Sequence, residues 1–251
     1  YGFSILSSHL HAGATLLVTQ RSVMEKSFWE FFSEAGGTSF AGVPYTYQML
    51  KRLGFMRKNP GALRTLTQAG GKLADNLVRE FVEYAGRTGI DFFVMYGQAE
   101  ATARISYVPP ARALEKAGSI GVAIPGGEMF LVDPAGREIT SADVEGQLGY
   151  RGANVSMGYA ENRTDLTRGD ERDGTLLTGD LARRDVDGYY YLTGRLSRIV
   201  KLFGKRVNLE DLEQICLDLV PEVACLGAED RVTIWITDGQ HQAALPRLLA
   251  E

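Results

Sequence analysis

The sequence is poor in cysteine. Only Cys216 and Cys225 occur among its 251 residues, and they are not spaced as a Cys-x-x-Cys pair. The patterns around them place the two in different elements, so we interpret them as buried thiols of a reducing compartment. We therefore expect the protein to be cytoplasmic.

Long apolar runs and an excess of positive charge are also missing. No run approaches the roughly 18 apolar residues of a membrane span, and the first residues lack the basic region of a signal peptide. The formal net charge of −4 gives no support for a nucleic-acid or anionic-membrane partner. The sequence begins at Tyr1, inside an apolar pattern, and we expect it to be a piece of a longer chain.

What is present is the composition of an ordinary soluble globular protein, with 45% hydrophobic and 23% charged residues. The length suits one large domain, or one domain and part of another. Neither an internal repeat nor a low-complexity segment is visible in the sequence.

The first hundred residues alternate between strand and helix patterns. The expected strands are 13–18, 38–44, 63–71 and 91–97. Amphipathic helices are expected over 22–36 and 46–55, and a third has apolar positions from Leu73 to Tyr84. Such alternation predicts an α/β fold, in which a mostly parallel sheet carries helices on its faces. Ligands bind such sheets outside the carboxyl ends of the strands.

From about Gly118 the pattern becomes β-rich and antiparallel, with turn signals at Asp133 and at Asp187-Gly188. After Gly194 it changes again to α+β. Strands are expected over 198–203, 223–227 and 231–238, and helices over 208–220, with Asn208 as the cap, and 244–251. We place a boundary near Ser197 and expect three parts, 1–117, 118–196 and 197–251.

Four segments could carry chemistry: MYGQAE, EGQLGYRGANVSMGY, TGDLARRDVDGYYYLTGR and KLFGKRVNLEDLE. Each alone is most often structural, but their order and spacing are informative. Asp180 and Arg195 lie 15 positions apart and flank a predicted hairpin, which would bring them together. A carboxylate that accepts two hydroxyl hydrogen bonds beside a guanidinium donor is suited to binding a ribose.

In order and spacing, these segments resemble motifs of the adenylate-forming (AMP-binding) enzyme superfamily. That superfamily includes acyl-CoA synthetases, peptide-synthetase adenylation domains and luciferase. The segments are similar to its Tyr-Gly-x-Thr-Glu, Gly-Glu-Leu…Gly-Tyr, Thr-Gly-Asp…Gly-Arg and Lys-x-x-Gly-x-Arg motifs. With AGSIGVAIPGG and LRTLTQAGG, the match covers essentially all of the chain. The resemblance implies part of the large N-terminal adenylation domain, followed by a truncated small C-terminal domain.

The resemblance also implies an activity and its ligands. ATP and a small carboxylic acid would give an acyl-adenylate and pyrophosphate, with magnesium bound to the phosphates. The acyl group would then pass to a thiol, either CoA or pantetheine on an acyl carrier protein. We expect no nucleic-acid partner.

Residue roles follow from the same resemblance. Tyr96, within the segment Tyr96-Gly97-Gln98, would stack on adenine, where an aromatic face adds contact area. Glu100 would hold magnesium, because a hard cation prefers carboxylate oxygen. Asp180 and Arg195 would bind the ribose. The remaining positions are assigned as a close backbone approach to the nucleotide at Gly70 and Gly71, an acyl pocket at Val43, Tyr45 and Met95, and a hinge at Ser197.

Plain structural interpretations stay open for these residues. Tyr96 could be a core aromatic at a strand end, Asp180 could cap its hairpin and pair with Arg195, and Gly70-Gly71 could be only a tight turn. Lys201, Lys205 and Arg206 could form a solvated basic face, or a loop that turns towards the site for the thiol step. His9 and His11 are interpreted as packing or surface residues rather than metal ligands.

Three departures from the family pattern bear on activity. Ala99 stands where the motif has a threonine whose hydroxyl donates to a phosphate oxygen, so one transition-state hydrogen bond is missing at this catalytic position. The family's pyrophosphate-binding loop would precede Tyr1, and its catalytic lysine would follow Glu251. We therefore expect a fragment of an acid–thiol ligase that has little activity by itself. The alternative is a non-catalytic nucleotide-binding or interaction module of the same fold.

Overall fold

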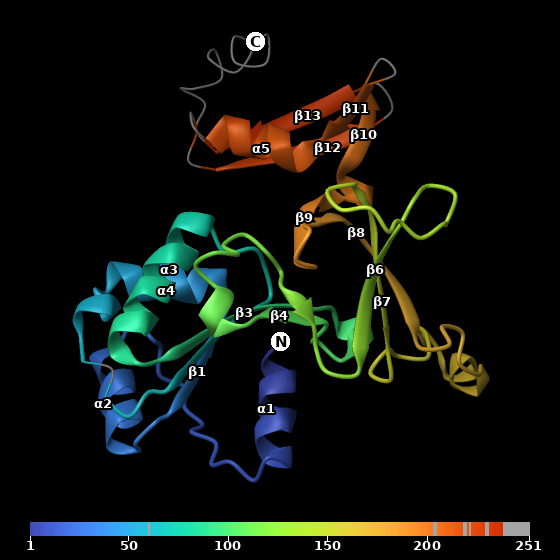
Figure 1. Ribbon diagram of the computed structural model, residues 1–251. Helices are drawn as coiled ribbons and strands as arrows, with labels where there is room; N and C mark the ends of the chain where they lie inside the picture. The colour runs from blue at the N-terminus through green and yellow to red at the C-terminus, as the bar shows by residue number, and fades with distance from the viewer. Residues whose placement is uncertain (60, 203–204, 218–219, 221, 229–230, 238–251) are drawn as a thin grey trace.

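The computed structural model describes residues 1–59, 61–202, 205–217, 220, 222–228 and 231–237. Figure 1 shows three groups of elements: helices around a first sheet, a second sheet beside it, and a small α+β group next to the end of the second sheet.

The first group contains four helices and a five-stranded sheet in the order β1-β2-β3-β4-β5. The helices are α1 (Gly2–His11), α2 (Lys26–Glu34), α3 (Pro44–Arg52) and α4 (Asp75–Thr88). The strands are β1 (Ser39–Gly42), β2 (Thr65–Gln68), β3 (Asp91–Tyr96), β4 (Ser106–Val108) and β5 (Val122–Ala123). Short 3₁₀ turns lie at η1 (Phe55–Arg57), η2 (Ala99–Ala101) and η3 (Pro110–Arg112).

The first sheet is mixed rather than mostly parallel. β1, β2 and β3 are parallel to one another, as the helix–strand alternation predicts, whereas β4 and β5 are antiparallel. The reason is the short connection after Tyr96, which reverses the chain through η2 without a crossover helix. The carboxyl ends of β2 and β3 therefore lie at the same edge of the sheet.

The core of the first group forms between this sheet and the buried faces of α3 and α4. Leu50 of α3 and Phe81 of α4 are fully buried, and they pack in one cluster with Leu66 and Phe92 of the sheet. Pro44 occupies the first turn of α3, where its missing amide hydrogen costs no hydrogen bond. This packing fixes the strand ends that form the edge of the cavity described below.

The second sheet is antiparallel, in the order β6-β7-β8-β9. Its strands are β6 (Gly127–Val132), β7 (Gly146–Gly152), β8 (Thr175–Arg184) and β9 (Tyr190–Arg195), with η4 (Arg163–Thr167) in the loop between β7 and β8. Turns close at Asp133 and at Asp187-Gly188, as the sequence predicts. The β8–β9 register places Asp180 opposite Arg195, which confirms the expected juxtaposition.

The third group follows η5 (Leu196–Arg198) and comprises β10 (Ile199–Leu202), β11 (Lys205–Asn208), α5 (Leu209–Leu217), β12 (Val223–Ala228) and β13 (Arg231–Ile236). The Asn208 side chain accepts a hydrogen bond from the Glu210 amide, as expected of a cap. Arg198 pairs with Glu213 and donates to the Cys225 carbonyl oxygen at 2.9 Å. The end of η5 is therefore tied to this group.

The two cysteines are buried free thiols, Cys216 in α5 and Cys225 in β12, as the sequence predicts. Burial raises the pKa of both thiols, that of Cys225 to about 11.

Several elements differ from the sequence-based expectations. The segment 13–18, expected as a strand, has no regular structure, and Val18 in it is 84% exposed. Helix α1 and strand β11 were not expected. The predicted helix over 244–251 lies outside the described residues. Within the described residues, the helices are too short or too polar to cross a membrane.

Candidate nucleotide site

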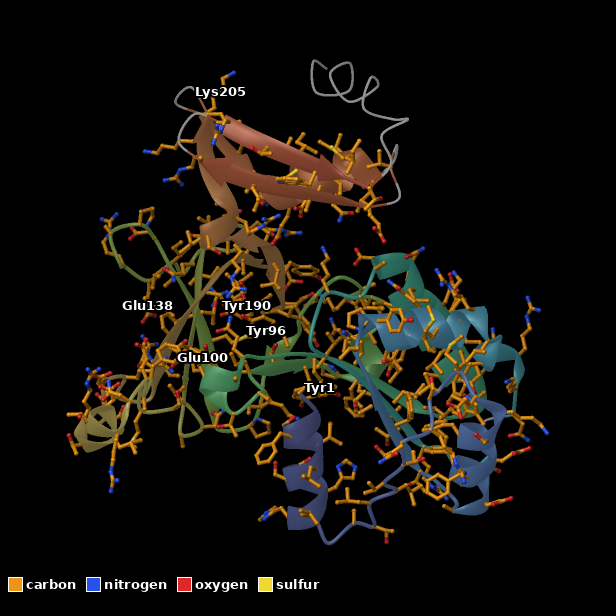
Figure 2. All side chains as sticks on the ribbon, turned by 180° about the vertical axis from the view of Figure 1, so that it is seen from behind. Tyr1, Tyr96, Glu100, Glu138, Tyr190 and Lys205 are labelled. Atoms are coloured by element: carbon orange, nitrogen blue, oxygen red, sulfur yellow. The ribbon has the colours of Figure 1, made fainter. Side chains whose placement is uncertain are left out.

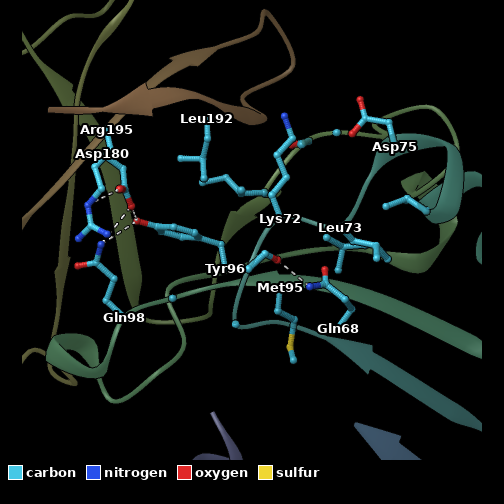
Figure 3. A pocket seen from close by; sticks show the side chains of 18 of the residues that line it. Gln68, Lys72, Leu73, Asp75, Met95, Tyr96, Gln98, Asp180, Leu192 and Arg195 are labelled. Atoms are coloured by element: carbon cyan, nitrogen blue, oxygen red, sulfur yellow. Dashed lines mark hydrogen bonds and ion pairs between the residues drawn. The ribbon is translucent and has the colours of Figure 1, made fainter. Parts of the chain in front are cut away.

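A cavity of about 410 Å³ lies where the carboxyl ends of β2 and β3 meet strands β8 and β9. Figure 3 shows its lining, which comes from both sheets. The first sheet contributes the segment after β2 and the run Met95–Glu100. The second contributes Asp180, Leu192 and Arg195. Two sheets that are distant in sequence therefore form one cavity at the predicted edge.

The Tyr96 phenol points across the cavity to Asp180. Its hydroxyl donates to Oδ2 of Asp180 at 2.5 Å. Gln98 strengthens the same link, because its Nε2 donates to Asp180 Oδ2 at 3.1 Å and to the Thr178 carbonyl oxygen at 3.0 Å. One carboxylate oxygen is thus held by two donors, Tyr96 at the end of β3 and Gln98 just after it.

Arg195 lies on the other side of the same carboxylate, with its Nε 3.5 Å from Asp180 Oδ1. The Arg195 side chain is 55% exposed, whereas that of Asp180 is only 13% exposed. The guanidinium therefore keeps donors free for a ligand, while the Asp180 carboxylate is fixed at Oδ2 by Tyr96 and Gln98.

The protonation of Tyr96 follows from this arrangement. Burial, together with the charge of Asp180, raises the pKa of the Tyr96 phenol far above its ordinary value. The phenol therefore stays protonated at physiological pH and continues to donate to Asp180.

Glycines permit the close backbone approaches at the cavity edge. Gly70 has φ +78°, in the left-handed region, and Gly70 and Gly71 both line the cavity. The Gln68 side chain donates to the Gly71 carbonyl oxygen at 2.8 Å and so fixes this turn. At Gly97, a Cβ would lie only 2.2 Å from the Ala103 carbonyl oxygen, which excludes any larger residue there.

Glu100 lies in the turn η2 and lines the same cavity. The Tyr159 hydroxyl donates to its Oε1 at 2.5 Å, and this hydrogen bond is the main reason that the pKa of Glu100 is lowered. An ionised carboxylate at this edge fits a magnesium ion that takes its other oxygens from phosphate and water. Among the described residues, no group of three His, Cys, Asp or Glu side chains forms a metal site.

Two predicted pocket residues do not line the cavity. Val43 is 38% exposed and lies outside the lining, beside Gly70. Tyr45 is 66% exposed, because α3 buries the face that carries Tyr47, and a residue two positions away points elsewhere. Of the three predicted acyl-pocket residues, only Met95 lines the cavity.

Other predicted residues are placed as follows. Ala99, which stands where the family motif has a threonine, lines the cavity. Ser197 lies in η5, away from the lining. Lys201 and Arg206 line a second cavity of about 460 Å³ between the second sheet and the third group. His9 lies in α1, where its Nδ1 donates to the Ile5 carbonyl oxygen at 2.8 Å.

Several lining residues were missed from the sequence. They are Gln68, Lys72, Leu73, Asp75, Ser119 and Leu192. Ser119 lies in AGSIGVAIPGG and Lys72 follows the Gly70-Gly71 turn, so proximity to these segments was the available signal. Tyr159, which contacts Glu100, ends the segment EGQLGYRGANVSMGY, whose resemblance to a family motif was the available signal.

The comparison with family models decides the family. The model described as "AMP-binding enzyme" matches residues 1–160. The chain belongs to this family. The match spans the Tyr96–Glu100 run and ends just after Tyr159.

Two CoA ligases are among the relatives that are similar to this chain. A 3-hydroxybenzoate–CoA ligase of Aromatoleum sp. (strain CIB) is 30% identical over 221 residues, which cover 86% of this chain and 40% of the ligase. An acetyl-coenzyme A synthetase of Penicillium chrysogenum is 29% identical over 215 residues, which cover 82% of this chain and 32% of the synthetase. The chain therefore spans about a third to two fifths of these relatives.

Solved structures of a CoA synthetase superpose on the chain. The o-succinylbenzoate CoA synthetase of Bacillus subtilis, solved with its acyl-adenylate intermediate, gives a TM-score of 0.76 at 22% identity, covering 99% of this chain and 51% of the synthetase. The same synthetase solved with ATP and a magnesium ion gives a TM-score of 0.74 at 23% identity, with coverages of 96% and 51%. At this identity the similarity establishes the shared fold.

Proposed function

We propose that the protein to which these residues belong uses ATP to activate a small carboxylic acid as its acyl-adenylate. The observation that carries the proposal is the convergence of Tyr96, Gln98, Asp180 and Arg195 on one cavity whose rim also holds Glu100. Relatives at about 30% identity are named as CoA ligases, which supports the same reaction class.

In this proposal each side chain has a separate task. Asp180, held by Tyr96 and Gln98, accepts hydrogen bonds from the ribose hydroxyls, and Arg195 donates to the ribose from the opposite side. The face of Tyr96 contacts the adenine ring. Gly70 and Gly71 let the backbone approach the adenylate closely.

Glu100 is the residue that would hold magnesium, and its ionised carboxylate is suited to that task. When bound, the ion would neutralise charge on the phosphates during displacement. Ala99 supplies no hydroxyl donor to a phosphate oxygen, so the neighbouring groups must provide the stabilisation of that charge.

The proposed reaction has two steps, adenylation of the acid and transfer of the acyl group. A carboxylate oxygen of the acid attacks the α-phosphorus of ATP, and pyrophosphate leaves with the electrons of the broken P–O bond. A thiol then attacks the acyl carbonyl carbon, loses its proton, and AMP leaves. We propose CoA or pantetheine on a carrier protein as the thiol, with a cytoplasmic location, and Met95 as part of the acid pocket.

The activity is proposed for the whole protein, because the chain spans less than half of its relatives. We also propose that 1–117 and 118–196 belong to the large domain, and that 197–251 begins a small one that turns at Ser197. Acid-dependent exchange of pyrophosphate into ATP by the whole protein tests the activity. The 251-residue chain alone is expected to give little exchange, and robust exchange would show that the catalytic parts are misassigned.

A second function is favoured by one observation, the methyl group of Ala99 at the cavity rim. It would be a nucleotide-binding module that kept the fold without the chemistry. Ala99→Thr in the whole protein separates the two functions. Exchange by the alanine protein rules out the non-catalytic function, whereas AMP binding without exchange in either version supports it. Mass spectrometry of the acylated acceptor then distinguishes a thiol from another nucleophile.

A further inference from the structure

Tyr159, in the loop after β7, contacts a residue at the rim of the nucleotide cavity. Tyr159 donates through its hydroxyl to Oε1 of Glu100 at 2.5 Å, across 59 positions of sequence. The Glu100 amide also hydrogen-bonds to its own carboxylate. Among the described residues, Tyr159 is the other residue that donates to this carboxylate, and its side chain does so at Oε1.

The Tyr159 ring is not fixed by burial, because the residue is 65% exposed. It is instead fixed by its contact with a cation, the guanidinium of Arg172. The guanidinium carbon of Arg172 lies over the ring, 4.6 Å from its centroid, and Arg172 Nη1 donates to Ser156 Oγ at 2.6 Å. A guanidinium that stacks on an aromatic face and is itself hydrogen-bonded restricts the orientation of the ring.

The backbone around Tyr159 is joined to the turn that carries Glu100. The Ser156 amide donates to the Glu100 carbonyl oxygen at 2.8 Å. Asn154 adds two contacts, since its Nδ2 donates to the Ala101 carbonyl oxygen at 2.6 Å and its own carbonyl oxygen accepts from Thr102 Oγ1 at 2.7 Å. The segment 154–159 and the turn η2 therefore form one unit around the carboxylate.

We propose that Tyr159 is a positioning residue that orients the Glu100 carboxylate for magnesium-bound ATP, and that Arg172 acts through Tyr159 by holding its ring. The inference rests on the proposed function, because it deepens the role of Glu100 in that site. Tyr159 does not touch the nucleotide in this scheme; it fixes Oε1 so that Oε2 faces the phosphates. Without it, the carboxylate samples several rotamers, and the geometry must be ordered on binding.

Calorimetric titration of the whole protein with ATP, with and without Mg²⁺, tests the assignment. The measured quantity is the ratio of the ATP affinity with Mg²⁺ to the ATP affinity without it. We expect this ratio to be about five- to tenfold smaller in Tyr159→Phe than in the unmodified protein, which is the size expected for loss of one charge-assisted hydrogen bond at an exposed site. AMP, which needs no metal, binds the variant with unchanged affinity.

Matched variants separate positioning from general damage. Tyr84→Phe removes a hydroxyl that is buried and has no hydrogen-bond partner in the described part of the chain, so Mg²⁺ dependence is unchanged. Arg172→Met keeps the Tyr159 hydroxyl but removes the cation over its ring, and it loses part of the Mg²⁺ effect. Both results, together with unchanged AMP affinity, exclude a merely structural role.

Two outcomes would overturn the proposal. If Tyr159→Phe keeps the full Mg²⁺-dependent gain in ATP affinity, Tyr159 does not position Glu100, while the proposed function is unaffected. If the unmodified protein shows no Mg²⁺-dependent gain at all, both the assignment of Tyr159 and the proposed role of Glu100 are wrong.

Discussion

Tyr96 and Asp180, 84 positions apart in sequence, are joined by a hydrogen bond of 2.5 Å that connects β3 of the first sheet to β8 of the second. The phenol and the carboxylate therefore lie in the same cavity and not on opposite faces of the molecule. Figure 2 shows Tyr96 and Glu100 close to the junction of the two sheets. The group expected to contact adenine is therefore also the group that orients Asp180, the expected ribose acceptor.

Asp180→Asn is expected to weaken AMP binding about tenfold or more, because a charged acceptor with two hydrogen-bond donors becomes a neutral amide. Isothermal titration of the whole protein with AMP measures the effect. Asp143→Asn is the control, since Asp143 pairs with Arg183 at the surface and its side chain is 59% exposed. Equal AMP affinity in the two variants would contradict the ribose assignment.

Gly97→Ala is expected to destabilise the protein by about 2 kcal/mol or more, because the new methyl group would overlap the Ala103 carbonyl oxygen. Gly86→Ala provides the opposite case. Gly86 lies inside α4 with open space around its Cα, so alanine is expected to stabilise by about 0.5–1 kcal/mol. Urea unfolding midpoints measure both; a neutral Gly97→Ala would mean that the turn after β3 can move.

Met95→Ala is expected to change which acids are activated, because Met95 lines the cavity. Removal of several methylenes enlarges the site, and each methylene is worth about 1–3 kcal/mol of discrimination. Tyr45→Ala should leave the acid preference unchanged, since this exposed side chain lies outside the lining. Pyrophosphate exchange with a panel of acids compares the two variants. A changed preference in Tyr45→Ala alone would restore the sequence-based assignment.

Stability should depend on pH through Asp185. Burial acts to raise the pKa of Asp185, but the Lys116 ammonium at 2.9 Å and amide hydrogen bonds from Tyr189 and Asp187 hold it below its ordinary value. A lowered folded pKa means that this stability is present above the unfolded value, about 3.9, and is lost as pH falls.

Urea unfolding between pH 7 and about pH 3 measures this contribution. The unmodified protein should lose more stability over the range than Asp185→Asn, which is less stable at neutral pH but has no such proton to take up. Parallel losses in the two proteins would show that the ion pair with Lys116 contributes nothing to acid sensitivity.

The elements that the sequence predicted well have strong local signals. The strand ending at Tyr96 and the hairpin at Asp187-Gly188 are specified by apolar runs and turn residues close to them in sequence. Segment 13–18 has the composition of a strand, but a strand also needs a hydrogen-bonding neighbour, which local composition does not report. Helix α1 has no acidic residue in its first turn and no side-chain cap, so no start signal was available.

In the candidate site, too, the residues with a local sequence signal were predicted, and those that depend on distant contacts were not. Asp180 and Arg195 could be brought close together from the hairpin alone, because a short turn sets the approximate register; the register shift between Leu181 and Ala182, which places the two residues directly opposite each other, could not be predicted. Val43, at the start of α3, and Tyr45, within it, lie outside the cavity lining, because the direction of each side chain depends on how α3 packs. The contact of Tyr159 with Glu100 depends on a long loop held by Arg172, and no local pattern specifies such a loop.

The turn η5 has a guanidinium at each border. Arg195, just before it, faces Asp180 of the second sheet, whereas Arg198, at its end, is anchored to Glu213 and the Cys225 carbonyl oxygen of the third group. Only Leu196 and Ser197 separate the two anchors. Any rotation of the third group must therefore be absorbed by the torsion angles of this dipeptide, directly beside the proposed ribose partner Arg195.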